Sequence, residues 1–306
     1  MDHRIAFVFS GQGAQYSGMG RELCQRSSAA RAVFARADAL RPGTSRQCFE
    51  GTEEELRETK NTQPCMFTVE LAAAAALEEA GVHAQMAAGF SLGELAALTF
   101  AGAADFDSGF RLVCSRGLRM QEASEVQDTA MAAVLKLENS QVEELCAQFR
   151  DIYPVNYNCP GQVTVSGLAS EMDAFSAAVK AAGGRAMPLK VRGAFHSPFM
   201  AQAAAGFEAD LRVCPLHAPT LPVYANRTAQ PYGQDVLPVL AQQICHPVLW
   251  DSTIRNMIAA GADTFIEVGP GRTLCNLIGK IDKSVRVFAA EKGSDLEKTL
   301  QEVSAV

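Results

Sequence analysis

The segment Gly89-Phe90-Ser91-Leu92-Gly93 constrains this chain most, because it predicts a strand, a sharp turn and a helix in immediate succession. Small apolar residues precede it at 86–88, and helix-forming residues follow at 94–98. Gly-x-Ser-x-Gly between a strand and a helix is the pattern of the nucleophile elbow, which lifts a serine hydroxyl to the N-terminus of the helix. A plain connecting turn can carry the same five letters. Ser91 is therefore a candidate nucleophile that other residues must support.

Composition excludes several classes of protein. The chain has 306 residues, is 48% hydrophobic and carries a formal net charge of −7, which argues against binding nucleic acid or anionic membranes. The strand-like start at residues 5–9 is too short for a signal peptide core, and we expect no membrane insertion. Nine cysteines without a Cys-x-x-Cys pair are typical of reduced thiols in a cytoplasmic protein and do not indicate a metal site.

Strand-like and helix-like segments alternate, which predicts an α/β fold with a parallel, hydrolase-like sheet around the elbow. Besides the elbow strand, we expect strands at 5–9, 264–268 and 285–290, and helices at 16–25, 29–39, 63–80 and 105–123.

The middle of the chain has a different order of expected strands and helices. Strands are expected at 130–137, 152–157, 162–166 and 185–189, and helices at 140–149 and 169–182. The order β-α-β-β-α-β is that of a small ferredoxin-like unit. We therefore expect a discontinuous catalytic domain, residues 1–127 and 194–306, interrupted by an insert at 128–193.

A serine nucleophile needs a base, and histidine is the usual choice near neutral pH. His196 lies in Gly193-Ala194-Phe195-His196-Ser197-Pro198, where small residues leave room for a ligand and Ser-Pro resembles a helix start. The other histidines stand near the terminus or in less suitable connections: His3, His83, His217 and His246. Elimination therefore favours His196 as the base.

Acyl transfer also needs hydrogen-bond donors for an oxyanion. The backbone N–H of Leu92 is one candidate by elbow geometry. A second is Gln12, in the loop 10–15 that leaves the first strand. This loop lacks the third glycine of a dinucleotide-binding pattern, because Tyr16 stands at that position.

Arg116 borders the apolar stripe of the helix expected at 105–123, next to Gly117. Most helical arginines are solvated surface charges, but one held at this border would be costly unless it were paired. The sequence offers no obvious acidic partner. A guanidinium suits bidentate carboxylate binding, so a substrate carboxylate is the sharper hypothesis.

Seven segments, in order and spread over nearly the whole chain, together resemble the malonyl-CoA:acyl-carrier-protein transacylases of fatty acid and polyketide synthesis. They are Phe9-Ser10-Gly11-Gln12-Gly13-Ala14-Gln15, Ser91-Leu92-Gly93-Glu94, Arg116-Gly117 with Met120-Gln121, Asn156-Tyr157-Asn158-Cys159-Pro160-Gly161-Gln162, Gly193-Ala194-Phe195-His196-Ser197-Pro198, Pro247-Val248-Leu249-Trp250 and Glu267-Val268-Gly269-Pro270-Gly271.

The resemblance implies a ping-pong transfer of a malonyl group from malonyl-CoA to the phosphopantetheine thiol of acyl carrier protein. The coenzyme A thioester is a substrate, and no permanently bound cofactor is implied. Ser91 would attack the thioester and His196 would take its proton, while Arg116 would bind the malonyl carboxylate. The N–H groups of Gln12 and Leu92 would hold the oxyanion.

The resemblance also implies roles for residues around this centre. A main-chain carbonyl near Gln243 would orient the histidine. Phe195 would leave little room for an α-methyl branch, and Met120 and Asn158 would contribute to substrate binding.

The chain departs from the family pattern at Phe90, where histidine is common, and at residues 124–128, which lack the usual glycine and proline. Two other functions stay open. A serine thioesterase or other hydrolase would use the same Ser91 and His196 but has no need of Arg116. An inactive carrier-docking scaffold is suggested by Phe90.

Overall fold

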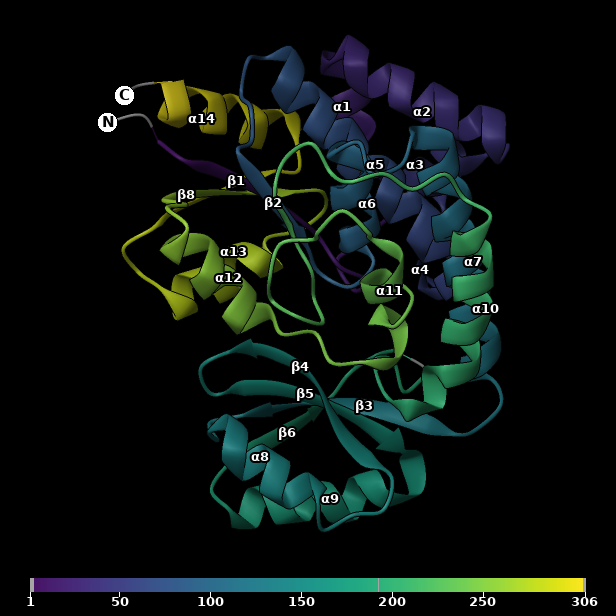
Figure 1. The fold of residues 1–306 in the computed structure, drawn as a ribbon, viewed down its shortest axis with the longest axis vertical. Helices are drawn as coiled ribbons and strands as arrows, with labels where there is room; N and C mark the ends of the chain where they lie inside the picture. Colours follow the sequence, from purple (N-terminus) through teal and green to yellow (C-terminus); the bar gives the residue numbers. More distant parts are fainter. Residues whose placement is uncertain (1–2, 192, 305–306) are drawn as a thin grey trace.

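Five parallel strands form the sheet that carries the elbow, in the order β7-β2-β1-β8-β9. Figure 1 labels β2, β1 and β8, which lie next to one another in it. The computed structural model describes residues 3–191 and 193–304. The strands are β1 Ile5–Phe9, β2 Met86–Gly89, β7 Val223–Tyr224, β8 Thr264–Val268 and β9 Arg286–Ala290. The predicted α/β fold with a parallel sheet is confirmed.

Side chains alternate across this sheet and so form two cores. Phe7 and Phe9 of β1 point into one, and Ala6 and Val8 into the other. Helices of the first core are α1 Arg21–Arg26, α2 Ser28–Leu40, α3 Thr44–Glu50, α4 Glu53–Arg57, α5 Thr59–Glu79, α6 Gly93–Phe100, α7 Phe106–Ser124, α10 Ala201–Arg212, α11 Leu237–Leu240 and α14 Gly293–Ser304. Those of the second core are α12 Trp250–Ala259 and α13 Thr273–Ile281. Because both faces are covered, the strands are buried and almost wholly apolar.

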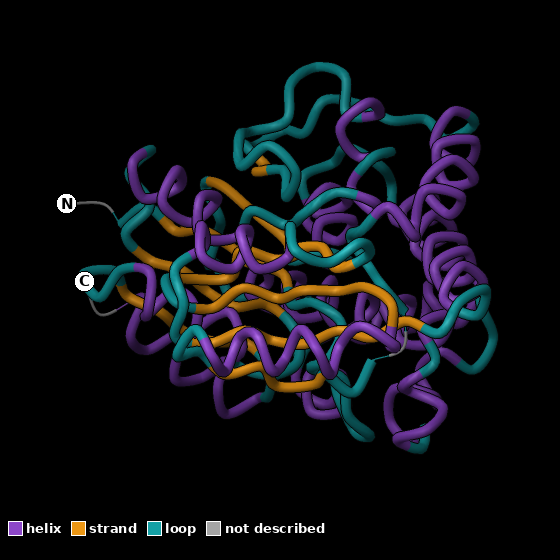
Figure 2. Tube along the Cα trace, turned by 90° about the horizontal axis from the view of Figure 1, so that it is seen from below, coloured by secondary structure: helices purple, strands orange, loops and turns teal. Residues whose placement is uncertain are grey.

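A second, antiparallel sheet has the order β4-β5-β3-β6 and carries two helices on its outer face, which lie across its strands in Figure 2. Its elements are β3 Thr129–Leu135, α8 Asn139–Cys146, β4 Ile152–Cys159, β5 Gln162–Leu168, α9 Ala169–Ala181 and β6 Arg185–Pro188. Val134, Val163 and Phe175 lie in its separate core.

Backbone hydrogen bonds join the second sheet to the segment between η2 and α12. The N–H of Tyr157 in β4 donates to the carbonyl of Val248 at 2.9 Å, and Val248 N–H donates to the carbonyl of Val155 at 2.9 Å. Two short 3₁₀ helices, η1 Pro198–Met200 and η2 Gln243–Cys245, lie near this junction. The inner face of the second sheet is thereby held over the carboxyl ends of β1 and β2.

Some predicted boundaries are wrong for local reasons. The helix expected at 16–25 begins only at Arg21, because Gly18 and Gly20 adopt left-handed φ angles of 101° and 78°. Helix α5 begins at Thr59 instead of 63, because Pro64 lies inside the helix and does not mark its start. Residues 1–2, 192 and 305–306, which belong to the expected domains, lie outside the described residues.

Within the described ranges, no helix has the length and hydropathy needed to cross a membrane.

Candidate active site

The turn after β2 holds Ser91 at φ 56°, an uncommon conformation for a residue with a side chain. The flanking glycines are required sterically. A Cβ on Gly89 would lie 2.0 Å from the carbonyl of Gly93, and one on Gly93 would lie 2.4 Å from the carbonyl oxygen of Phe9. Asn226 clamps the turn: its Oδ1 accepts from the Ser91 N–H at 2.7 Å, and its Nδ2 donates to the Gly89 carbonyl at 2.6 Å. The strained turn is thus over-determined by its surroundings, as expected at a functional site.

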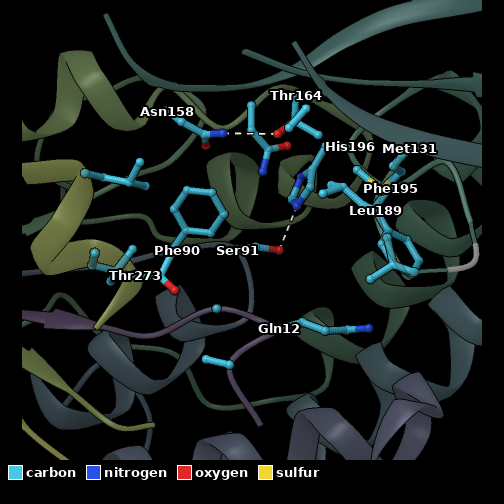
Figure 3. A pocket seen from close by; sticks show the side chains of 18 of the residues that line it. Gln12, Phe90, Ser91, Met131, Asn158, Thr164, Leu189, Phe195, His196 and Thr273 are labelled. Atoms are coloured by element: carbon cyan, nitrogen blue, oxygen red, sulfur yellow. Dashed lines mark hydrogen bonds between the residues drawn. The ribbon is translucent and has the colours of Figure 1, made fainter. Parts of the chain in front are cut away.

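The Ser91 Oγ and the Nε2 of His196 are 2.7 Å apart (Figure 3). On the other side of the ring, Nδ1 lies 3.0 Å from the carbonyl oxygen of Gln243 and 3.2 Å from that of His246. Because both of these oxygens can only accept, the Nδ1 atom must carry the proton, which leaves Nε2 free to accept from the serine hydroxyl. Burial, reinforced by the nearby charge of Arg116, lowers the pKa of His196 to about 4. The imidazole is therefore neutral at physiological pH, as a general base must be.

Two backbone N–H groups belong to residues near this pair: Leu92 directly follows Ser91, and Gln12 lines the same cavity as Ser91 and His196. Leu92 precedes α6, and Gln12 follows β1, which pairs with β2 so that Phe9 is opposite Gly89. Among the described residues, neither N–H donates to a protein acceptor. Both N–H groups are thus available to an oxyanion at the carboxyl edge of the sheet. The Gln12 side chain reaches Thr59, whose Oγ1 accepts at 3.3 Å.

Arg116 on α7 is completely buried beneath Ser91. Its Nη1 donates to Gln63 Oε1 at 2.9 Å, and its Nη2 to Gln243 Oε1 at 2.7 Å and to Ser91 Oγ at 3.2 Å. Burial lowers the pKa of Arg116 to about 10, so the guanidinium stays charged at neutral pH. Gly117 allows this position, because a Cβ there would lie 2.9 Å from the Thr59 carbonyl of α5.

No carboxylate of the described part of the chain forms a salt bridge with Arg116. Glu94 lies on the far side of the Gln243 amide, and its electrostatic interaction with Arg116 favours the charged guanidinium. The carboxylate of Glu94 accepts from the Nε2 of Gln243 at 2.8 Å. The Gln243 side chain also donates to the Ser91 carbonyl at 2.6 Å. Gln243 therefore contacts the nucleophile, the base, the arginine and the glutamate.

Sequence reasoning missed the side chains of Gln63, Glu94, Asn226 and Gln243. Glu94 alone gave a signal, because an acidic residue follows the elbow directly on an otherwise apolar helix. Nothing in the sequence near Asn226 indicates that it contacts a turn more than a hundred residues away.

A cavity of about 260 Å³ opens above Ser91, between the two sheets. Met131, Leu189 and Phe195 lie on one side of it, and Phe90, Thr273 and Asn158 on the other (Figure 3). Met120, Leu274 and Leu277 also line it. Three expected substrate-binding residues, Met120, Asn158 and Phe195, thus line it. Met120 Sδ also accepts from Gln63 Nε2 at 3.3 Å, and Asn158 Nδ2 donates to Thr164 Oγ1 at 3.1 Å.

Phe90 packs as an apolar wall of this cavity. Its ring meets that of the buried Trp250 edge-on, with centroids 5.4 Å apart. It also lies against the loop after β1, because a Cβ on Gly11 would be 2.8 Å from the Phe90 ring. The residue before the nucleophile therefore contributes packing here in place of a hydrogen bond.

Comparison with known proteins matches residues 6–294 to the acyl transferase domain. The chain belongs to the acyl transferase family. The malonyl CoA-acyl carrier protein transacylase of Bacillus subtilis is 36% identical over 97% of this chain and 96% of its own length. The protein of the same name from Escherichia coli K12 is 35% identical over 97% and 99%.

Solved structures of this family superpose over the whole fold. The malonyl CoA-acyl carrier protein transacylase of Clostridium perfringens gives a TM-score of 0.95 at 35% identity, over 99% of this chain and 98% of that one. A malonyl-transacylase solved in complex with its type II polyketide acyl-carrier protein gives 0.94 at 32% identity, over 98% and 99%.

Proposed function

We propose that this protein transfers a malonyl group from malonyl-CoA to the phosphopantetheine thiol of acyl carrier protein through an ester on Ser91. The observation that carries the proposal is the position of Arg116, a buried cation whose Nη2 lies 3.2 Å from the Ser91 Oγ. A site for neutral acyl groups gains nothing from a desolvated guanidinium, whereas a malonyl ester brings a carboxylate within a few bonds of Oγ.

In the first half-reaction, Ser91 Oγ attacks the thioester carbonyl while His196 Nε2 takes the hydroxyl proton. The N–H groups of Gln12 and Leu92 hold the negative oxygen of the tetrahedral intermediate. The intermediate breaks its C–S bond, and the proton on His196 goes to the departing coenzyme A sulfur. Charge on the imidazolium is stabilised by the Gln243 and His246 carbonyls, which take the part that an aspartate plays in other serine enzymes.

In the second half-reaction, His196 takes the proton of the phosphopantetheine thiol, and the sulfur attacks the ester carbonyl. Collapse breaks the C–Oγ bond and returns the proton from His196 to Ser91. The cycle is a ping-pong exchange in which every proton moves through one imidazole. It uses coenzyme A only as part of the substrate and calls for no permanently bound cofactor.

The cavity supports a preference for an unbranched malonyl group. The ring of Phe195, next to the base, and the side chains of Met120 and Met131 all line it. An α-methyl branch has to share this space with buried rings and thioethers that resist compression. Asn158 supplies an amide on the side opposite Phe195 (Figure 3).

The second sheet supports the proposed insert. Its connectivity β3-α8-β4-β5-α9-β6 agrees with the order β-α-β-β-α-β expected of a ferredoxin-like unit. We infer that residues 128–193 form this insert in a hydrolase-like catalytic domain made of 1–127 and 194–306. The free state of all nine cysteines agrees with a cytoplasmic location.

Intact-mass measurement after incubation with malonyl-CoA tests the proposal directly. Wild type is expected to gain one malonyl group, Ser91→Ala none, and addition of phosphopantetheinylated carrier protein should move the group to the carrier. Release of free malonate as the dominant product would identify a hydrolase. Absence of any adduct on wild type would favour the carrier-docking scaffold.

A further inference from the structure

Glu94 is a fully buried carboxylate with no role in the proposed cycle. Its Oε1 accepts from the backbone N–H of Asn226 at 3.1 Å and from the hydroxyl of Tyr232, and its Oε2 accepts from Gln243 Nε2 at 2.8 Å. Both oxygens thus receive donors, an arrangement that suits a carboxylate better than a protonated acid.

The Gln243 amide lies between this carboxylate and Arg116. Its nitrogen donates to Glu94, and its oxygen accepts from Arg116 Nη2 at 2.7 Å. An anion on one side and a cation on the other fix the amide in this orientation, because the reverse orientation would place donor against donor and acceptor against acceptor. Glu94 and Arg116 therefore form an ion pair bridged by an amide, buried throughout.

We propose that Glu94 sets how strongly the site favours an acyl group that carries a carboxylate, by acting as the counter-charge of Arg116 across Gln243. This inference rests on the proposed function and adds a specificity-determining residue to it. Glu94 touches neither the thioester nor Ser91 Oγ, so it acts through Arg116 and Gln243.

The physical consequence is a competition between two carboxylates for one guanidinium. When an acyl carboxylate reaches Arg116, it meets the field of ionised Glu94 in a site from which water is excluded, where charges interact strongly. Protonation of Glu94 removes that repulsion. A neutral acyl group such as acetyl, which has no carboxylate, does not experience it.

The groups that face Glu94 allow this switch near neutral pH. The ionisable ones are Arg116 from α7 and Tyr232 from the segment after β7. Burial raises the pKa of Glu94 to about 7, against the opposing effects of its hydrogen bonds and of Arg116. A substrate carboxylate ordinarily stays ionised throughout this range.

The test measures the rate constants for acylation of Ser91 by malonyl-CoA and by acetyl-CoA as a function of pH. The quantity compared is the ratio of the malonyl rate constant to the acetyl rate constant. Effects of His196 and of the shared coenzyme A moiety cancel in this ratio. We expect the ratio in wild type to fall about tenfold as the pH rises from 6 to 8.5. A ratio that stays constant over this range overturns the proposal.

Three variants refine the test. Glu94→Gln should give a ratio that does not change with pH. Tyr232→Phe removes one donor to the carboxylate, which should move the midpoint of the fall to higher pH. Glu70→Gln is the matched control, because it also removes a buried carboxyl group but one outside this network, and its ratio should follow wild type.

A second measurement does not depend on any variant folding. Formation of the malonyl ester at pH 7.5 should take up more protons than formation of the acetyl ester, because the new carboxylate raises the pKa of Glu94. Calorimetry in buffers of different ionisation enthalpy measures the difference, and equal uptake would contradict the proposal. If no malonyl ester forms at any pH, the proposed function itself fails, which is a different outcome.

Discussion

Two buried glutamates on neighbouring helices have opposite surroundings. Glu94 on α6 accepts three hydrogen bonds and has Arg116 nearby. Glu70 on α5 is equally buried, but within residues 3–191 and 193–304 neither of its oxygens has a hydrogen-bond partner. Burial, together with the neighbouring acid Glu267, holds the pKa of Glu70 well above its usual range.

The difference shows that the fold offsets the cost of burying an ionisable group in two ways, by hydrogen bonds or by neutralisation. Around Ser91, a carboxylate, a guanidinium and an imidazole are buried together. Both carboxylate oxygens, both Nη atoms of Arg116 and both ring nitrogens have polar partners, and of the nitrogens and oxygens of these three groups only Arg116 Nε lacks one among the described residues. Near Glu70, the fold tolerates a carboxyl group by keeping it protonated. We therefore expect changes in the Ser91 region to alter rates, and a change at Glu70 to alter stability.

Removal of the base should have the largest effect. His196→Ala is expected to slow acylation of Ser91 about a thousandfold, because the hydroxyl then loses its proton acceptor. The melting temperature should change little. Acylation is measured by rapid-quench intact mass and stability by thermal unfolding. A loss of stability large enough to explain the rate would contradict the division between the two regions.

Removal of the cation comes next. Arg116→Ala should slow malonyl transfer about a hundredfold, in line with the loss of charge-assisted hydrogen bonds, while acetyl transfer falls little or rises. The comparison of both thioesters on one variant separates carboxylate recognition from general damage. Equal losses for the two substrates would refute the carboxylate role of Arg116.

The sequence predicts the three central residues of the site for reasons that have little to do with long-range contacts. Ser91 is predicted by its local turn, His196 by elimination among five histidines, and Arg116 by its place on the helical stripe. The supporting amides cannot be predicted in this way, because Gln63, Asn226 and Gln243 become important only when distant segments meet. The Glu94 network depends on a contact across 149 positions of the chain.

Helices and strands likewise could be predicted where the signal is local and not where it depends on distant segments. The periodic segments at 105–123 and 169–182 match α7 and α9 within a residue or two, because apolar spacing decides them locally. The two-residue strand β7 carries no pattern of its own, yet it completes the sheet and leads to Asn226. Tertiary pairing alone makes it a strand.

The acid side of the pH profile sharpens the comparison further. Acetyl transfer, which does not involve Glu94, should stay constant from pH 8 down to about 5.5 and fall with a midpoint near 4. That midpoint is the pKa of His196, lowered by burial and by Arg116. The expected measurement is acylation by acetyl-CoA at short reaction times. A midpoint near the ordinary histidine value would mean that the imidazole is solvated in the working enzyme.

The smallest expected effect concerns Glu70. Its pKa is raised in the folded state, so the folded chain holds this proton more tightly than the unfolded chain does. Wild type therefore loses stability as the pH rises from the unfolded pKa, about 4.3, toward the folded value. Glu70→Met removes an unpaired carboxyl group and should raise the free energy of unfolding by about 1–3 kcal/mol at neutral pH.

Urea unfolding at pH 5 and pH 8 separates the pH-dependent effect of the Glu70 carboxyl group from the effect of its burial. The increase in the free energy of unfolding of Glu70→Met over wild type should be larger at pH 8, because only wild type loses stability between these two pH values. The free energy of unfolding of Glu70→Gln, relative to wild type, should also increase from pH 5 to pH 8. At pH 5 it should exceed wild type by less than that of Glu70→Met does, because the glutamine amide stays buried without partners. A Met variant that is less stable than wild type at both pH values would show that Glu70 has a favourable interaction equivalent to those of Glu94.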